Sequence, residues 1–192
     1  MRFEKVSFEQ FFKDYQSLKP DSEAWYVEEW LENLRFNPQW VEENIYNKIK
    51  IPARATVGSA GYDFFAPFDF GLRAPYSFDD TYIRRDSSIK FPTGIRIVLD
   101  DDKYLAIYPR SGLGFKYKVQ LFNTVGIIDR DYYYSDNEGH IWVKLYNDSP
   151  EGKRLAIKQG EAFCQGIIQQ YFLTEDDEAN GIRNGGLGST GA

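Results

Sequence analysis

The sequence has almost none of the side chains that most often bind metals or form nucleophile–base pairs. Its 192 residues include one cysteine, Cys164, and one histidine, His140. A single cysteine excludes a disulfide within the chain, and the two residues together cannot supply an ordinary structural zinc site. The same scarcity argues against Ser-His-Asp and Cys-His triads unless His140 acts alone. Catalysis would therefore depend on carboxylates, arginines, hydroxyl groups or a borrowed metal ion.

The sequence has fewer basic than acidic side chains, with 23 Lys and Arg against 29 Asp and Glu, and its formal net charge is −6. Proteins that bind duplex DNA neutralise many phosphates with Lys and Arg, so we expect no direct nucleic-acid binding. The sequence has no apolar run of membrane-spanning length and no basic, apolar leader. We therefore expect a soluble cytoplasmic protein with no membrane partner. A small anionic ligand needs only a local cluster of donors, for which Arg110 and Arg183 are candidates.

Residues 1–48 are predicted to form a helical N-terminal extension. Ser7 and Gln10 are spaced as a capping box, and Asn37-Pro38 has the form of an N-cap followed by a proline in the first turn. The apolar helix faces would pack against the main domain or a sister subunit, and a docking surface for another protein is the alternative. These faces consist of Phe8, Phe11, Phe12 and Tyr15, then Val27, Leu31 and Leu34, then Val41, Ile45 and Ile49.

From Ile51 onward the pattern changes to short β-branched and aromatic segments separated by turn residues, which predicts an all-β barrel or sandwich. There is no alternation of strands with helices and no glycine-rich loop with the needed Lys, which argues against Rossmann and P-loop sites. Residues 67–86 have no clear period and are predicted to be a long surface excursion. The expected strands are residues 94–99, 104–108, 140–146 and 166–172.

Two segments carry groups that suit a phosphate ester. On a loop after a strand, Arg110 and Ser111 could grip adjacent phosphoryl oxygens, while Gly112 lets the backbone approach closely. A plain tight turn with a surface arginine explains this segment about as well. Residues 160–165 precede a late strand, and Cys164 within them is expected to be a small buried hydrophobe.

The segment from Asn123 to Tyr132 is predicted to contain a β-hairpin with Gly126 at its tip. Backbone groups exposed there could read a flat base, and the Asn123 amide can both donate and accept. Asp129 follows an apolar pair, where partial burial could make it a base toward water. Tyr132 could lie against a sugar ring and leave no space for an extra hydroxyl. An ordinary hairpin with exposed acids is the alternative reading.

The chain ends in a glycine-rich run that could close over a polyphosphate. Closely spaced glycines let backbone N–H groups turn toward one anion. Ser189 and Thr190 add hydroxyl donors, and Arg183 adds a permanent positive charge. Taken alone, such an end could equally be a frayed terminus.

Five segments, in this order, resemble the five motifs of the trimeric deoxyuridine triphosphatases. Each is weak by itself, whereas the ordered set is specific. The resemblance implies a β jelly-roll-like subunit in residues 49–180 and a homotrimer whose active sites are shared between subunits and covered by an arm, residues 181–192. The implied reaction is hydrolysis of dUTP to dUMP and pyrophosphate, with Mg²⁺ held mainly by the triphosphate and by no protein ligand directly. The segments are residues 60–63, 109–112, 126–132, 160–165 and 186–191.

The resemblance also implies roles for individual positions. Asp129 would orient the water that attacks the α-phosphorus and would contact the sugar 3′-hydroxyl, while Tyr132 would pack on deoxyribose and exclude ribose. Asn123 and the backbone of Gly126-Ile127-Ile128 would read uracil. The other implied roles are phosphate contacts at Arg110, Ser111, Gly112 and Gln165, an arm over the terminal phosphates at Arg183, Gly188, Ser189 and Thr190, and a structural, supporting role at Asp63.

Three features depart from the family pattern, and two alternatives remain. Leu187 replaces the usual Phe that stacks on uracil, residues 133–138 predict an extended hairpin, and the N-terminal extension is additional. A dCTP deaminase shares the fold, but Lys144 stands where that branch has its proton-handling Glu. The other alternative is a regulatory protein that keeps the nucleotide fold and binds a protein partner through the N-terminal helices.

Overall fold

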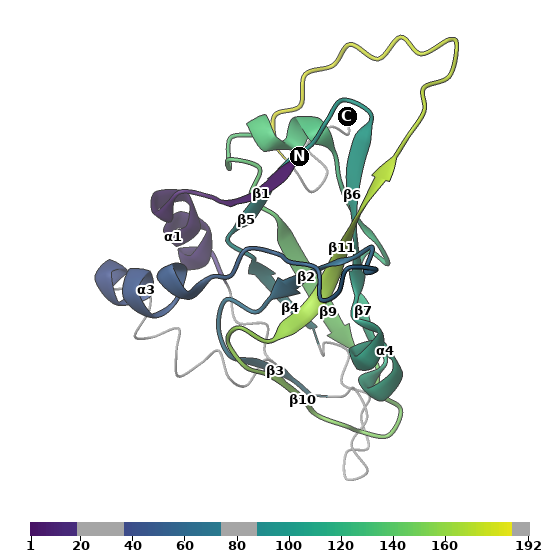
Figure 1. Ribbon diagram of the computed structural model, residues 1–192. Helices are drawn as coiled ribbons and strands as arrows, with labels where there is room; N and C mark the ends of the chain where they lie inside the picture. The colour runs from purple at the N-terminus through teal and green to yellow at the C-terminus, as the bar shows by residue number, and fades with distance from the viewer. Residues whose placement is uncertain (19–36, 74–87, 186–192) are drawn as a thin grey trace.

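The structure is a computed structural model that describes residues 1–18, 37–73 and 88–185. Most of its regular elements are strands, which confirms the predicted mainly β fold (Figure 1). The helices are α1 Phe8–Gln16, α3 Pro38–Asn44 and α4 Ser111–Tyr117, with 3₁₀ turns η1 Tyr46–Lys48 and η2 Arg130–Tyr134. The strands are β1 Arg2–Lys5, β2 Tyr62–Phe65, β3 Phe70–Leu72, β4 Ser88–Pro92, β5 Ile95–Val98, β6 Lys103–Pro109, β7 Val119–Leu121, β8 Gly126–Ile128, β9 Trp142–Asn147, β10 Leu155–Ile157 and β11 Ala162–Gln170.

The strands form antiparallel sheets that enclose one aromatic core. The largest sheet has the order β2-β11-β6-β8, a second has the order β4-β9-β7, and β1-β5 and β3-β10 form two-stranded sheets. Rings from three sheets meet inside: the centroid of Phe91 lies 5.0 Å from that of Phe70 and 5.2 Å from that of Phe163. Because all three side chains are almost fully buried, this cluster fixes how the sheets pack.

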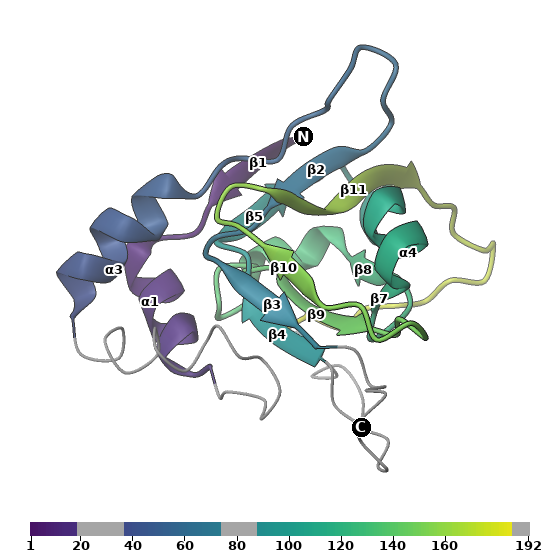
Figure 2. The same cartoon turned by 90° about the horizontal axis from the view of Figure 1, so that it is seen from below.

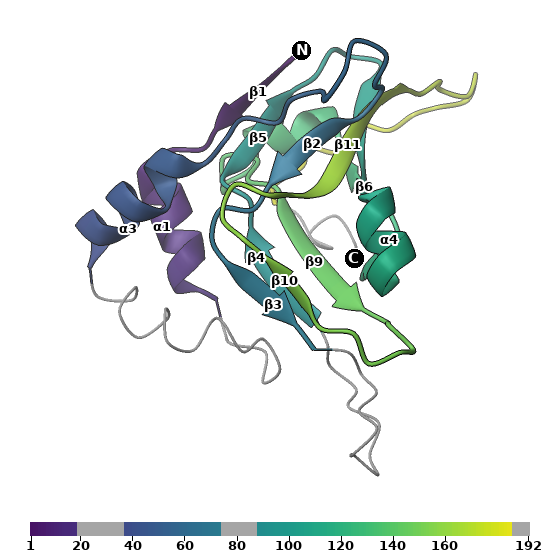
Figure 3. The ribbon, with the colours of Figure 1, turned by 60° about the horizontal axis from the view of Figure 1, so that its bottom comes forward.

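The N-terminal extension packs against the β domain. Helices α1 and α3 lie side by side on one flank of the β domain, on the side away from α4 (Figures 2 and 3). Ser7 caps α1 and Asn37 caps α3, each accepting a backbone N–H bond three residues on, as the sequence predicts. The predicted apolar faces turn inward, with Phe11, Tyr15, Val41, Ile45 and Ile49 buried.

Two local expectations about the extension change in the structure. The second bond of the predicted capping box is missing, because the Ser7 N–H donates to Glu138 Oε2 (2.8 Å) and not to Gln10. In addition, residues 2–5 precede the helices as strand β1, which pairs with β5 in register from Arg2↔Val98 to Lys5↔Ile95. The predicted helix with Val27, Leu31 and Leu34 lies outside the described residues, and the domain division at residue 48 stays a prediction.

The predicted surface excursion over residues 67–86 is wrong in its first part. Phe68, Phe70 and Leu72 are buried, and residues 70–72 form β3, which pairs with β10. A strand buried on both faces has no polar–apolar alternation, so its sequence does not show the period that marks a half-exposed strand. Residues 74–86 lie outside the described part of the chain.

Candidate active site

Asp129 stands directly after β8, as the N-cap of the 3₁₀ turn η2. Its side chain is 47% exposed, so the partial burial expected from the sequence is modest. Arg183 reaches it from the C-terminal segment: Nη2 donates to Asp129 Oδ2 (2.5 Å), and Nε donates to Asp131 Oδ1 (2.8 Å). The segment after β11 makes a wide excursion, the yellow trace in Figure 1, before Arg183 meets the two carboxylates. The carboxylates and the guanidinium together form a charged end to the site.

Two cavities open beside Asp129. The larger one, about 510 Å³, also has Tyr104, Ile127 and Tyr171 in its wall. A smaller one, about 100 Å³, brings together residues that the sequence predicted to hold the base and the sugar. Its lining consists of Asn123, Gly126, Ile127, Ile128, Asp129, Tyr132, Trp142 and Arg183.

The backbone near this small cavity differs from the predicted hairpin. β7 pairs with β9 and β8 pairs with β6, so the strands on either side of the turn belong to different sheets. The left-handed residue of the turn is Thr124 (φ 67°), and Gly126 is the first residue of β8 and not the tip of a hairpin. β8 is an edge strand of its sheet, so part of its backbone donors and acceptors face away from β6. Such an edge is suited to reading a planar ligand.

The hydroxyl group of Tyr132 is anchored by the segment that follows it in the sequence. Its hydroxyl donates to the carbonyl oxygen of His140 (2.8 Å) and accepts from Asn137 Nδ2 (2.7 Å). Burial raises the pKa of Tyr132, so the hydroxyl remains a proton donor. Residues 133–138 do not extend a hairpin as predicted. Residues 133 and 134 end η2, and the chain continues into a turn with positive φ at Glu138 (57°) and Gly139 (68°). A Cβ at position 139 would lie 2.6 Å from Tyr133 Cα, so the close return requires glycine.

The predicted phosphate-binding residues gather at a different place. Arg110 precedes α4, and Ser111 and Gly112 form the first turn of this helix, so the predicted loop is wrong. Asp63 Oδ1 lies 3.3 Å from Arg110 Nε and supports its guanidinium. Gln165 lies inside β11, not before it, and its side chain covers Gly61, where a Cβ would come 2.6 Å from Oε1. β2, β6 and β11 thus bring three predicted motifs together.

Within one chain, the predicted phosphate-binding residues lie far from Asp129. Ile128 pairs with Leu105 near the start of β6, so Asp129 lies at that end, whereas Arg110 follows the other end of the strand. Six residues of extended chain span about 20 Å. Within the described part of the chain, neither cavity lined by Asp129 has Arg110, Ser111, Gly112 or Gln165 in its wall.

Other chemistry-bearing residues take the following places. Cys164 is buried, as predicted, and burial raises the pKa of its thiol. His140 is fully buried and bonded to Asp14, so it does not face the cavities. Lys144 lies with Nζ 4.2 Å from the ring centroid of Phe122. The predicted arm residues Leu187, Gly188, Ser189 and Thr190 lie outside the described residues.

Two residues of the site were not singled out from the sequence. Asp131 shares Arg183 with Asp129, although the sequence showed it only as one of two closely spaced acids. Trp142 lines the small cavity because β9 pairs with β7 in the same sheet, and no local pattern could have revealed that contact. Among the described residues, no group of three or more His, Cys, Asp or Glu could hold a metal ion. No helix within the same ranges is long and apolar enough to cross a membrane.

Comparison with known proteins identifies the family. A family model described as dUTPase matches residues 47–191. The deoxyuridine 5′-triphosphate nucleotidohydrolase of Lactococcus lactis is 36% identical over 148 residues, covering 75% of this chain and 89% of that protein. That of Laribacter hongkongensis is 39% identical over 144 residues, covering 73% and 87%. The crystal structure of dUTPase from Streptococcus mutans is 28% identical, covers 65% of this chain and 88% of that one, and superposes with a TM-score of 0.53. This ordered agreement of motifs, fold and sequence confirms the jelly-roll-like fold and shows that the chain belongs to the dUTPase family.

Proposed function

We propose that this chain hydrolyses dUTP to dUMP and pyrophosphate, with residues 49–180 as the catalytic domain and residues 181–192 as a closing arm. The proposal is carried by one observation: Asp129, Tyr132, Asn123 and the edge strand β8 line one small cavity. In this combination, the carboxylate can orient a water molecule, the tyrosine ring can pack on the sugar, and the backbone of the edge strand can form hydrogen bonds with the base. The family membership and the names of the relatives support the same reaction.

The base is read by β8 and Asn123. The outward backbone groups of an edge strand present N–H donors and C=O acceptors at fixed positions, and uracil has complementary groups on one edge. The exocyclic amine of cytosine would meet a donor where uracil offers an acceptor, which costs a buried hydrogen bond.

Asp129 orients the attacking water toward the α-phosphorus. Phosphoryl transfer depends on positioning and charge neutralisation more than on a covalent nucleophile, which suits a site with carboxylates and arginines. Arg110, Ser111, Gly112 and Gln165 would contact phosphoryl oxygens, and Arg183 would turn from Asp129 toward the terminal phosphates. These donors fit a triphosphate that carries its own Mg²⁺, which would neutralise charge on the phosphoryl oxygens.

A complete site requires a second copy of the chain. The carboxylate and the phosphate-binding group lie at opposite ends of β6, about 20 Å apart along an extended strand. The phosphates of a nucleotide held beside Asp129 therefore need the Arg110 group of a neighbouring subunit. A closed ring of identical subunits supplies that group to every site in the same way, which supports the homotrimer.

The direct test is incubation of the purified chain with each deoxynucleoside triphosphate and with UTP in the presence of Mg²⁺. We expect dUMP and pyrophosphate from dUTP and little turnover of the others, because base and sugar are both read. Chromatography of the nucleotide products separates the alternatives. Conversion of dCTP to dUTP would indicate a deaminase, and no turnover of any nucleotide would contradict the proposal.

Leu187→Phe is expected to tighten the binding of a non-hydrolysable dUTP analogue by about tenfold. An aromatic ring stacked on a base contributes about 1–3 kcal/mol, which an aliphatic side chain does not replace. Isothermal titration calorimetry with the wild type, Leu187→Phe and Leu187→Ala measures the effect. Equal or weaker affinity for the Phe variant would argue against the proposed lid over the base.

A further inference from the structure

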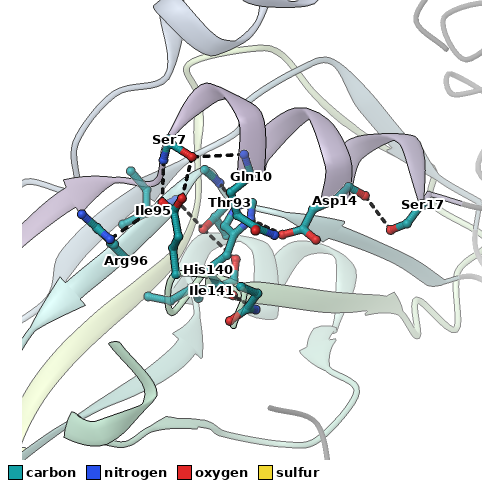
Figure 4. Close-up of polar contacts among 12 residues, drawn as sticks. Ser7, Gln10, Asp14, Ser17, Thr93, Ile95, Arg96, His140 and Ile141 are labelled. Atoms are coloured by element: carbon teal, nitrogen blue, oxygen red, sulfur yellow. Dashed lines mark hydrogen bonds and ion pairs between the residues drawn. The ribbon is translucent and has the colours of Figure 1, made fainter. Parts of the chain in front are cut away.

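The N-terminal segment, outside the part of the chain that matches the family, contacts the loop that holds Tyr132. We define residues 2–17 as the brace and residues 129–140 as the sugar loop. Three separate polar contacts join them, and the one between Asp14 and His140 can be followed in Figure 4. The match to the family model begins at residue 47, so the brace lies outside the matched residues.

The first contact links α1 to Tyr132 through one buried residue. Asp14 Oδ2 lies 2.6 Å from His140 Nδ1, and the Gly94 N–H donates to His140 Nε2 (2.8 Å). Because Nε2 accepts, the neutral ring carries its proton on Nδ1 and donates it to Asp14. The carbonyl of the same His140 accepts from the Tyr132 hydroxyl. Asp14 therefore fixes the residue to which Tyr132 is anchored.

The second contact joins the start of α1 to the end of the sugar loop. Glu138 accepts from the Ser7 N–H (2.8 Å) and from Ser7 Oγ (2.6 Å). Glu138 has φ 57°, a conformation that glycine adopts more readily than any L side chain. The hydrogen bonds that its carboxylate accepts from Ser7 explain why a glutamate occupies this position. Burial raises the pKa of that carboxylate, but the hydrogen bonds from Ser7 and the charge of Arg96 hold it below its ordinary value.

The third contact ties β1 to the middle of the sugar loop. The Tyr133 hydroxyl donates to Glu4 Oε2 (3.1 Å), and Arg96 Nη2 lies 3.1 Å from the same oxygen. The guanidinium of Arg96 also lies over the Tyr133 ring, 4.6 Å from its centroid. The brace thus holds the sugar loop at its middle and at its end, while the loop begins at Asp129.

We propose that the brace positions Tyr132 against the sugar, so that Asp14 and Glu138 are positioning residues for the discrimination of deoxyribose from ribose. The inference rests on the proposed function. A tyrosine that excludes a hydroxyl must be fixed to within a fraction of an ångström, because a ring that yields admits the larger sugar. Arg183 and Asp101 bind only the start of the loop, residues 129–131. Farther along, the loop is held at Tyr133, Glu138 and His140 by side chains of the brace and by Arg96.

The test compares kcat/KM for dUTP and for UTP in Asp14→Ala, Asp14→Asn and Glu9→Ala. Asp14→Ala leaves the buried His140 Nδ1–H without its partner, and we expect the dUTP:UTP ratio to fall by about tenfold or more, mainly through KM. Asp14→Asn restores most of the ratio, because its amide oxygen still accepts from Nδ1. Glu9 is an exposed carboxylate on the same helix, so Glu9→Ala is the matched control and keeps the wild-type ratio.

Glu138→Gly provides a second variant that does not empty a buried site. Glycine suits φ 57° better than glutamate, so any loss comes from the missing carboxylate and not from backbone strain. We expect a lower dUTP:UTP ratio and faster hydrogen exchange of the amides of residues 130–140, measured by mass spectrometry.

Unchanged ratios in both Asp14→Ala and Glu138→Gly would overturn the inference while leaving the proposed function intact. If Asp14→Ala does not fold, Glu138→Gly alone decides the question. If the dUTP:UTP ratio falls equally in Glu9→Ala, the effect is a general one of changing α1, and the inference is overturned as well. A wild-type chain that hydrolyses no dUTP would overturn the proposed function, and this inference with it.

Discussion

Asp129→Asn is expected to lower the turnover of dUTP by about 10²–10⁴-fold and to leave nucleotide affinity nearly unchanged. Asparagine has the shape of aspartate and can still accept the hydrogen bond from Arg183 Nη2. It lacks the negative charge that orients water and takes up its proton, so the loss falls on kcat. Steady-state release of pyrophosphate gives kcat, and calorimetry with a non-hydrolysable analogue gives the affinity.

Asp131→Asn is the matched comparison for this variant. It removes the same charge and also removes a carboxylate that binds Arg183, through Nε at 2.8 Å. Because Asp131 has no proposed contact with the water, we expect a far smaller loss of kcat. Similar losses in the two variants would assign the effect to Arg183 or to the local charge, and near-wild-type turnover of Asp129→Asn would remove Asp129 from the mechanism.

Chains carrying Asp129→Asn and chains carrying Arg110→Ala are each expected to be nearly inactive at low dUTP, yet to regain about a quarter of the wild-type activity when assembled together in equal amounts. In a closed ring, each site takes its carboxylate from one subunit and its phosphate-binding arginine from the next. Random assortment then places two unaltered contributions in the same site about one time in four. The two residues lie at opposite ends of β6, so a single chain does not combine them.

The experiment requires co-assembly of two tagged forms in equal amounts, by coexpression or joint refolding. The activity of the whole mixture is assayed, and capture on each tag in turn verifies that mixed oligomers are present. The control is Asp129→Asn mixed with the double variant Asp129→Asn/Arg110→Ala, in which every site lacks the carboxylate and no recovery is expected. Absence of recovery in the first mixture, with mixed oligomers present, would mean that each site is built within one chain. Size-exclusion chromatography with light scattering reports the oligomeric state of each sample.

The sequence predicted more of the site than of the backbone that carries it. Asp129, Tyr132 and Asn123 line one cavity as expected, because they flank the same short strand, β8. The supposed hairpin around Gly126 was wrong, since β7 and β8 pair in different sheets, and strand pairing depends on contacts distant in sequence. α4 was also missed, because two glycines within seven residues argue against a helix on propensity alone.

The sequence by itself determined the mainly β fold, the capped helices α1 and α3, and the ordered motifs that place the chain in the dUTPase family. These properties follow from local patterns: β-branched periodicity, capping residues, and short motifs whose chemistry depends on a few neighbouring side chains. The tertiary structure alone decided that Arg110 lies apart from Asp129, that Trp142 enters the cavity, and that Asp14 and Glu138 meet the sugar loop. Those contacts join segments far apart along the chain, and only the packing of the whole domain fixes which of them form.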